Sequence, residues 1–276
     1  MKGSAIDAII MKKYLILLST SLLLGACSED VGKEINTDLV QEAEQFFGLS
    51  EAFGESSYLG NLTYEDYLRI VSAELPGCPT IIHNPDTKII ELDYSSPQEC
   101  EQENTASRTG KIILDFTLAD SEDPNWSLAY DSYTFKGSEL TGTRMFIQLS
   151  SSENQESFEN LTIKSDQELT FVAEGELSYV ISRSNLTPVS LTTRGQIKGR
   201  NPAGRNFSLV ITEAKEQLFQ CYSASWELPQ RGKESWIVSR TASSSVDYRV
   251  SFEPTETCNP VVISTLPDGR SLQLNP

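Results

Sequence analysis

After Cys78 the chain consists of short apolar runs with a period of two, and this pattern constrains the fold more than any other feature. The runs are rich in β-branched and aromatic residues and are separated by turn sequences such as Pro85-Asp86, Glu174-Gly175 and Pro267-Asp268-Gly269. Such runs are typical of antiparallel strands. We expect strands near residues 81–82, 88–92, 111–118, 145–149, 169–173, 177–181, 207–211, 236–238, 246–252 and 261–263. Long helical segments do not separate these runs, so residues 78–276 are predicted to form a mainly β, antiparallel multi-stranded sheet or sandwich.

A short helical leader precedes the β region. From Thr37 to Phe53 apolar residues recur every three to four positions, which predicts a helix with its start capped by Thr37 or Asp38. A second helix is expected over 64–73, and Gly77 ends it. We therefore assign residues 37–77 to a helical leader.

Two stretches of the β region resemble each other. Residues 93–114 and 251–274 each contain a strand, a proline turn, a cysteine, a loop, a glycine next to a basic residue and a further strand. This order is compatible with an internal duplication, but short segments of a β protein also match by composition alone. Both interpretations stay open at this point.

The N-terminus has the pattern of an export signal. Lys12 and Lys13 precede an apolar run over 14–24, which is shorter than the ~20 residues of a membrane span. Leu24, Gly25, Ala26 and Cys27 then resemble the cleavage site of bacterial lipoproteins, in which the cysteine receives a diacylglyceryl group. We expect a signal peptide over 1–26 with its true start at Met11, cleavage after Ala26, and lipidation of Cys27.

Residues 27–36 are short, polar and acidic, and we interpret them as a tether between the lipid and the folded part. Glu29-Asp30 resembles the acidic surface-export signal of lipoproteins from Bacteroidota. The expected location is the outer membrane, with the protein facing the periplasm or the cell surface.

Charge limits the classes of partner. Removal of residues 1–26 takes away three lysines and one aspartate from 22 basic and 39 acidic side chains, which leaves a net charge of about −19. A surface of this sign repels phosphate backbones and anionic head groups. We therefore expect no nucleic acid partner, and membrane contact only through the lipid anchor.

Four cysteines follow the lipidation site: Cys78, Cys100, Cys221 and Cys258. An even number in an oxidising compartment predicts two disulfides, and four cysteines allow three pairings. We prefer the local pairing, Cys78 with Cys100 and Cys221 with Cys258, because each pair flanks a predicted hairpin. Metal and cofactor binding are not expected, because Cys-x-x-Cys spacing is missing and His83 is the one histidine.

The sequence offers little evidence for catalytic residues. His83 lies in a predicted turn and the chain has no Gly-x-Ser-x-Gly motif, so a nucleophilic triad is not expected. A hydrolase that uses two carboxylates stays an alternative, and Asp115, Glu168 and Asp247 are its candidates because they lie within or beside apolar runs. We expect no enzyme activity.

Three tryptophans are the candidate ligand contacts. Trp226 and Trp236 flank a turn over 229–232 and are predicted to face each other across a hairpin, whereas Trp126 is expected in an exposed loop. Exposed rings would form a platform for a sugar, and buried rings would be part of the core. The core interpretation is favoured for the pair.

Several motifs in a fixed order resemble a family of uncharacterised β-rich lipoproteins from Bacteroidota, of which this chain would be a divergent member. They are Cys78-Pro79-Thr80, the Cys100 turn, residues 108–112, residues 133–137 leading to residues 140–144, and the late pair Cys221 and Cys258. The resemblance implies the envelope location and the β fold, and it carries no activity. The sequence therefore predicts a lipid-anchored envelope protein with a binding or structural role and a glycan or an envelope protein as partner. A surface glycan-binding lipoprotein of a nutrient-uptake system is the alternative.

Overall fold

The computed structural model describes residues 38–96, 102 and 105–275, of which residues 39 onward belong to one compact unit. The expected signal peptide, the cleavage residues Leu24, Gly25 and Ala26, the lipidation site Cys27 and the tether lie outside the described residues. The predicted fold class is confirmed, because one antiparallel sheet of 14 strands dominates the structure. The strands are β1 (Thr80–Asn84), β2 (Ile89–Asp93), β3 (Arg108–Asp115), β4 (Asn125–Phe135), β5 (Ser138–Thr141), β6 (Thr143–Gln148), β7 (Glu153–Lys164), β8 (Thr170–Ser184), β9 (Thr187–Arg200), β10 (Asn206–Leu218), β11 (Arg231–Ser239), β12 (Ser245–Glu253), β13 (Val261–Thr265) and β14 (Ser271–Gln273).

The helical segments are short apart from the first. They are α2 (Leu39–Glu55), α3 (Ser57–Gly60), α4 (Tyr64–Tyr67), the 3₁₀ helix η1 (Ser72–Glu74) and α5 (Phe219–Tyr222). The predicted first helix is confirmed, but the helix expected over 64–73 breaks after one turn because Leu68 and Val71 stay exposed and gain nothing from packing. Within the described part of the chain, no helix is both long and apolar enough to cross a membrane.

Strand order follows chain order. Neighbouring strands pair from β1 to β5 and from β7 to β14, and β6 pairs with β4 and β7. The two similar stretches of sequence take different courses: β2 and β3 pair directly, whereas β13 lies between the second cysteine loop and β14.

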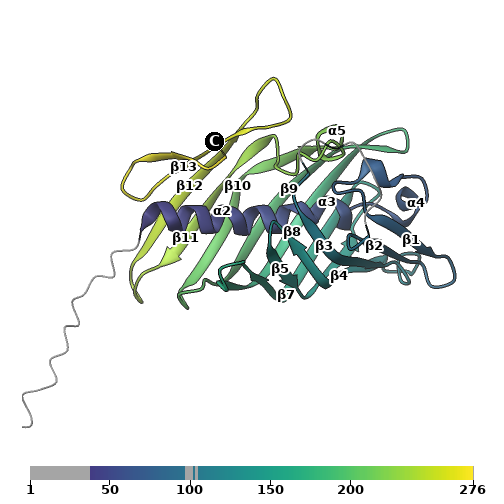
Figure 1. Cartoon of the computed structure of the whole chain (residues 1–276), viewed down its shortest axis with the longest axis horizontal. Helices are drawn as coiled ribbons and strands as arrows, with labels where there is room; N and C mark the ends of the chain where they lie inside the picture. Colours follow the sequence, from purple (N-terminus) through teal and green to yellow (C-terminus); the bar gives the residue numbers. More distant parts are fainter. Residues whose placement is uncertain (1–37, 97–101, 103–104, 276) are drawn as a thin grey trace, which may run out of the picture. The chain divides into compact units, whose positions relative to one another are not determined.

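Helix α2 lies across the strands and packs on the inner face of the sheet (Figure 1). Phe46 makes aromatic contacts with Phe171 of β8 and with Trp236 of β11, with centroid distances of 5.6 and 5.9 Å. Phe53, two turns further along the same face of α2, stacks on Phe158 of β7 at 5.3 Å. Because one helix contacts strands that are far apart in the sheet order, the sheet curls around α2.

Two glycines inside long strands let neighbouring residues pack against the backbone. One of them lies where the sequence predicts a turn. Glu174-Gly175 lies within the continuous strand β8, where a Cβ on Gly175 would be 2.5 Å from the ring of Phe158. At Gly199 of β9 a Cβ would be 2.1 Å from the carbonyl oxygen of Val172. These glycines are needed for contact across the sheet, so the two short strands expected at this place are one strand.

The predicted disulfide between Cys221 and Cys258 is confirmed. It joins α5 to the loop before β13, with a Cα separation of 5.3 Å. Cys78 is also disulfide-bonded, and Cys100 lies outside the described residues. The predicted link between Cys78 and Cys100 stays a prediction.

Candidate functional site

The late tryptophans do not form a sugar platform, and the favoured core interpretation is confirmed for Trp236. Trp236 lies on β11 between Leu209 of β10 and Tyr248 of β12 and is fully buried. Trp226 lies in the loop between α5 and β11 and is half-buried. The expectation that they face each other across a hairpin is wrong, because the segment after Cys221 forms α5 and a loop instead of a strand.

Trp126 is also placed differently from the prediction. It lies on β4, not in an exposed loop, and only 7 % of it is exposed. Its ring stacks on Phe116 and on its cross-strand neighbour Phe146, and its Nε1 donates a hydrogen bond of 2.7 Å to the carbonyl oxygen of Gly60. The indole is therefore fixed in the core with one edge close to the surface.

That edge lines a cavity of about 170 Å³, which we call the loop-end cavity. The segments that form it are the start of α4, the β1–β2 turn, the β3–β4 loop with the start of β4, the β6–β7 loop with the adjoining strand ends, and the end of β8. The pairing register places these strand ends at one edge of the sheet. The residues that decide its chemistry are Tyr64, Lys88, Phe116, Asp120, Trp126 and Arg183.

The loop-end cavity combines aromatic walls with charged groups whose positions are set by other contacts. The Lys88 ammonium pairs with Asp120 and lies 6.0 Å from the ring centroid of Tyr64. Arg183 donates hydrogen bonds of 2.9 and 2.6 Å to both carboxylate oxygens of Asp66. Burial alone would raise the pKa of Asp66, but the hydrogen bonds from Arg183 and Thr63 lower it below its ordinary value. Both cations are thus held in place without a ligand.

Sequence reasoning identified Trp126 but missed its neighbours. Tyr64, Lys88, Phe116 and Arg183 come from four separate segments and share no motif. The strand register brings Lys88, Phe116 and Arg183 to one edge of the sheet, and α4 places Tyr64 beside them.

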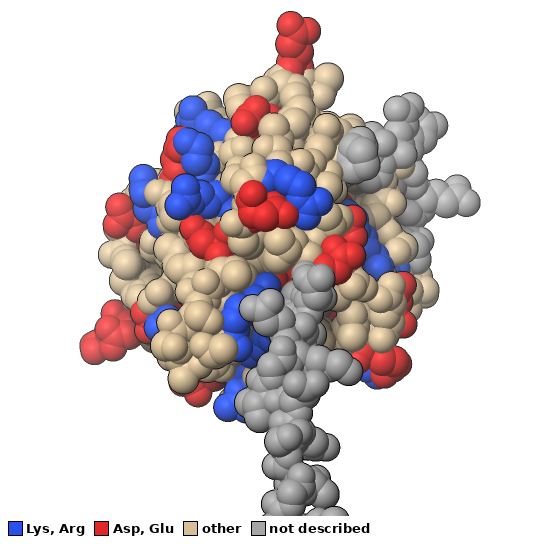
Figure 2. Space-filling view, turned by 90° about the vertical axis from the view of Figure 1, so that its left-hand side faces the viewer, with Lys and Arg blue, Asp and Glu red and all other residues tan. Residues whose placement is uncertain are grey.

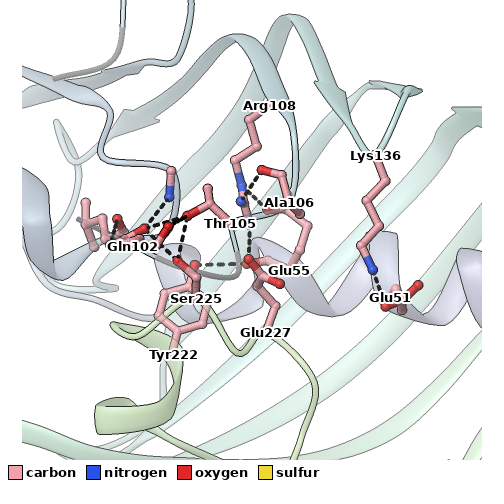
Figure 3. Close-up of polar contacts among 12 residues, drawn as sticks. Glu51, Glu55, Gln102, Thr105, Ala106, Arg108, Lys136, Tyr222, Ser225 and Glu227 are labelled. Carbon is pink, nitrogen blue, oxygen red and sulfur yellow. Dashed lines mark hydrogen bonds and ion pairs between the residues drawn. The ribbon is translucent and has the colours of Figure 1, made fainter. Parts of the chain in front are cut away.

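A second group of polar residues lies at the end of α2, and we call it the Arg108 cluster: Arg108, Glu55, Tyr133 and Glu227. Figure 3 shows Arg108, Glu55 and Glu227 of this cluster. Arg108 Nη2 donates to Glu227 Oε1 at 2.8 Å, and Arg108 Nε lies 3.6 Å from Glu55 Oε2. The Tyr133 hydroxyl donates to the same Glu55 oxygen at 3.0 Å. These contacts connect the helix to β3, to β4 and to the loop after α5.

Beside this cluster, Glu51 and Glu227 line a small cavity between α2 and strands β8 to β12. Glu51 Oε1 accepts a hydrogen bond of 2.7 Å from Lys136 (Figure 3). Burial raises the pKa of Glu51 and of Glu55, and this effect exceeds the opposing attraction of Lys136 and Arg108. The cavity measures about 40 Å³, which is room for a few water molecules and not for a sugar ring.

The acids proposed from the sequence do not form a catalytic pair. The side chains of Glu168 and Asp247 are 77 % and 39 % exposed, and Asp115 caps its own turn by accepting hydrogen bonds from Thr117. The buried carboxylates are Glu42, Glu55, Asp66, Glu156 and Glu234 instead. Each of these five contacts a base, so the pairs fix the fold.

His83 lies exposed on β1 and not in a turn. Among residues 38–96, 102 and 105–275, no group of three or more His, Cys, Asp or Glu side chains is arranged to hold a metal ion. No family model, curated protein or solved structure matches this chain.

Proposed function

We propose that the protein is a lipid-anchored protein of the bacterial outer membrane whose folded part binds a sugar ring in the loop-end cavity. The anchor is supported by the sequence before Cys27, and the acidic residues after it favour the cell surface. Membership in the β-rich lipoproteins of Bacteroidota is part of this proposal. The single observation that supports binding is the combination of aromatic walls and fixed charged groups at the loop-end cavity.

A sugar ring has apolar C–H faces and polar hydroxyl edges. Tyr64 is half-buried and supplies the accessible aromatic wall, whereas Phe116 and Trp126 are 1 % and 7 % exposed and add only a small edge. Lys88, Asp120 and Arg183 supply donors and acceptors at the same opening. The volume of about 170 Å³ is below the ~300–1,000 Å³ of sites for larger ligands, so one ring of a glycan would enter. Capture of a glycan end for uptake is the role that this geometry supports best.

Binding is tested with the mature chain carrying Cys27→Ser, which keeps the folded part and removes the lipid. We would measure affinity for an array of mono- and oligosaccharides, compare Lys88→Met, and use Lys233→Met as the control because Lys233 is an exposed lysine that also pairs with a carboxylate. The expected result is a loss of affinity of about tenfold or more for Lys88→Met alone. Equal affinity in the two variants, or no bound saccharide, would refute the sugar site.

The anchor has its own test. Radiolabelled palmitate should enter the wild type and not Cys27→Ala. Protease added to intact cells should digest the wild type and spare a form in which Glu29 and Asp30 are neutralised. Protection of both forms would place the protein inside the envelope and leave the binding test unaffected.

A further inference from the structure

Three basic residues in the described part of this acidic protein have no acidic partner. Within residues 38–96, 102 and 105–275, every lysine and arginine lies within 4.0 Å of a carboxylate oxygen except Arg194, Lys198 and Arg200. In a chain with a formal charge of −17, bases without a partner are the exception. All three lie on one strand, β9.

The three side chains share one face of that strand. Their positions differ by even numbers, so they point the same way, and all three are exposed. With ~3.3 Å per residue, Lys198 and Arg200 are ~7 Å apart along the strand, and Arg194 is ~13 Å from Lys198. They form a line of positive charge ~20 Å long on the outer face of the sheet.

Lys198 and Arg200 line an open groove of about 750 Å³ that crosses β8 to β11. Asn160, Asn206 and Ser208 add amide and hydroxyl groups, and Glu174, opposite Lys198 on β8, is the one acid in the lining. Gly199 lies between the two bases in the sequence, and its backbone forms part of the lining. Figure 2 shows the end of the molecule where α2 begins, where Lys and Arg side chains lie among Asp and Glu side chains.

We propose that this groove binds an anionic glycan, a polysaccharide that carries carboxylate or sulfate groups. The bases would pair with the acidic groups, and the amides and the serine would bind hydroxyls between them. Single-stranded nucleic acid is disfavoured because the one aromatic side chain in the lining, Phe207, is 3 % exposed and offers no stacking surface. An anionic membrane is disfavoured because the bases lie in a hollow and the net charge is negative.

The groove is separate from the loop-end cavity and shares no lining residue with it. The inference adds a second site to the proposed glycan role, and its test uses different residues. It stands or falls independently of whether a sugar ring binds at Lys88.

The test uses the mature chain with Cys27→Ser, and measures retardation in gels containing alginate, dextran sulfate or neutral dextran. The wild type should be retarded by the two anionic polymers and not by dextran. The double variant Lys198→Gln/Arg200→Gln should lose at least tenfold in affinity, while the control Lys233→Gln/Arg249→Gln, which removes two partnered exposed bases, should bind as the wild type does. Far-UV circular dichroism checks that each variant is folded.

Several results would overturn the proposal. Equal retardation by neutral dextran would show that binding does not depend on the charge of the polymer. Unchanged binding in the double variant would show that the anion binds elsewhere. Tighter binding to oligo(dT) or to phosphatidylglycerol vesicles than to alginate would assign the groove to another partner. Because Lys88→Met should leave alginate binding intact, loss of alginate binding in that variant would also refute a separate site.

Discussion

A buried ion pair between β6 and β7 should determine much of the stability of this fold. Arg144 and Glu156 are both fully buried, and Arg144 donates to both Glu156 oxygens at 2.6 and 2.9 Å. The same guanidinium donates to the Phe53 carbonyl and to the Ser56 hydroxyl at the end of α2. One side chain thus joins the sheet to the helix that the sheet encloses.

The substitution Glu156→Gln keeps the size of the side chain and leaves the Arg144 charge buried without its partner. Removal of one member of a buried pair costs about 3 to 5 kcal/mol. For a domain of this size, each kcal/mol lowers Tm by about 2 to 4 °C, so the expected decrease is about 6 to 20 °C. Urea unfolding followed by tryptophan fluorescence and far-UV circular dichroism measures the free energy directly.

Two further variants make this prediction specific. Glu168→Gln removes one member of the exposed Lys164–Glu168 pair and should leave the urea midpoint unchanged. Arg144→Met/Glu156→Leu removes both buried charges and should be more stable than Glu156→Gln. A loss of unfolding free energy below about 1 kcal/mol for Glu156→Gln, in a single transition, would refute the argument, because it would show that the pair contributes no more than an exposed ion pair does.

The remaining predictions concern the disulfide, the glycines and acid. The variant Cys221→Ala/Cys258→Ala opens a loop with a sequence separation of 37, which should cost about 4 kcal/mol and lower Tm; an unchanged melt would contradict this. Gly199→Ala should destabilise the sheet because its Cβ meets backbone, whereas Gly54→Ala, which meets nothing within 4 Å inside α2, should stabilise by about 0.5–1 kcal/mol in urea unfolding. The folded-state pKa of Asp66 is lowered below 3.8, so its contribution is present above pH 3.8 and lost as the pH falls through the folded value. Asp66→Asn should therefore flatten the acid limb of the stability profile, and an identical limb would refute the assignment.

The sequence predicts the fold class and the first helix because both depend on local periodicity. The errors arise where packing between distant segments overrides a local signal. Glu174-Gly175 has the composition of a turn, but the ring of Phe158 occupies the space where a side chain on Gly175 would lie, and β8 continues through both residues. Trp126 follows a proline and looks exposed, but cross-strand pairing with Phe146 turns its ring inward.

The candidate sites were harder to predict for the same reason. The loop-end cavity depends on strand register, which no single segment encodes. The assignment of the groove as an anion site depends on which bases have no carboxylate partner. These bases can be identified only when the positions of the carboxylates are known. The alternation of side chains along β9 puts Arg194, Lys198 and Arg200 on one face. It does not distinguish these three from the bases that form ion pairs within the fold.

The ion pairs inside this protein determine which charges remain on its surface. The acids of α2 meet bases from the rest of the chain: Glu42 with Arg240, Glu51 with Lys136 and Glu55 with Arg108. Because intramolecular pairs engage nearly every base of the described residues, the surplus of acids gives a negative field, and in this part of the chain only Arg194, Lys198 and Arg200 of β9 lie farther than 4.0 Å from every carboxylate oxygen. At 0.1 M salt the screening length is ~10 Å, so acids far from the groove act weakly on an anion there, while Lys198, Arg200 and the one acid of the lining, Glu174, act at close range. If the proposed groove binds a polyanion, the molecule would repel that polyanion at long range and hold it at contact, which favours selective binding over general adhesion.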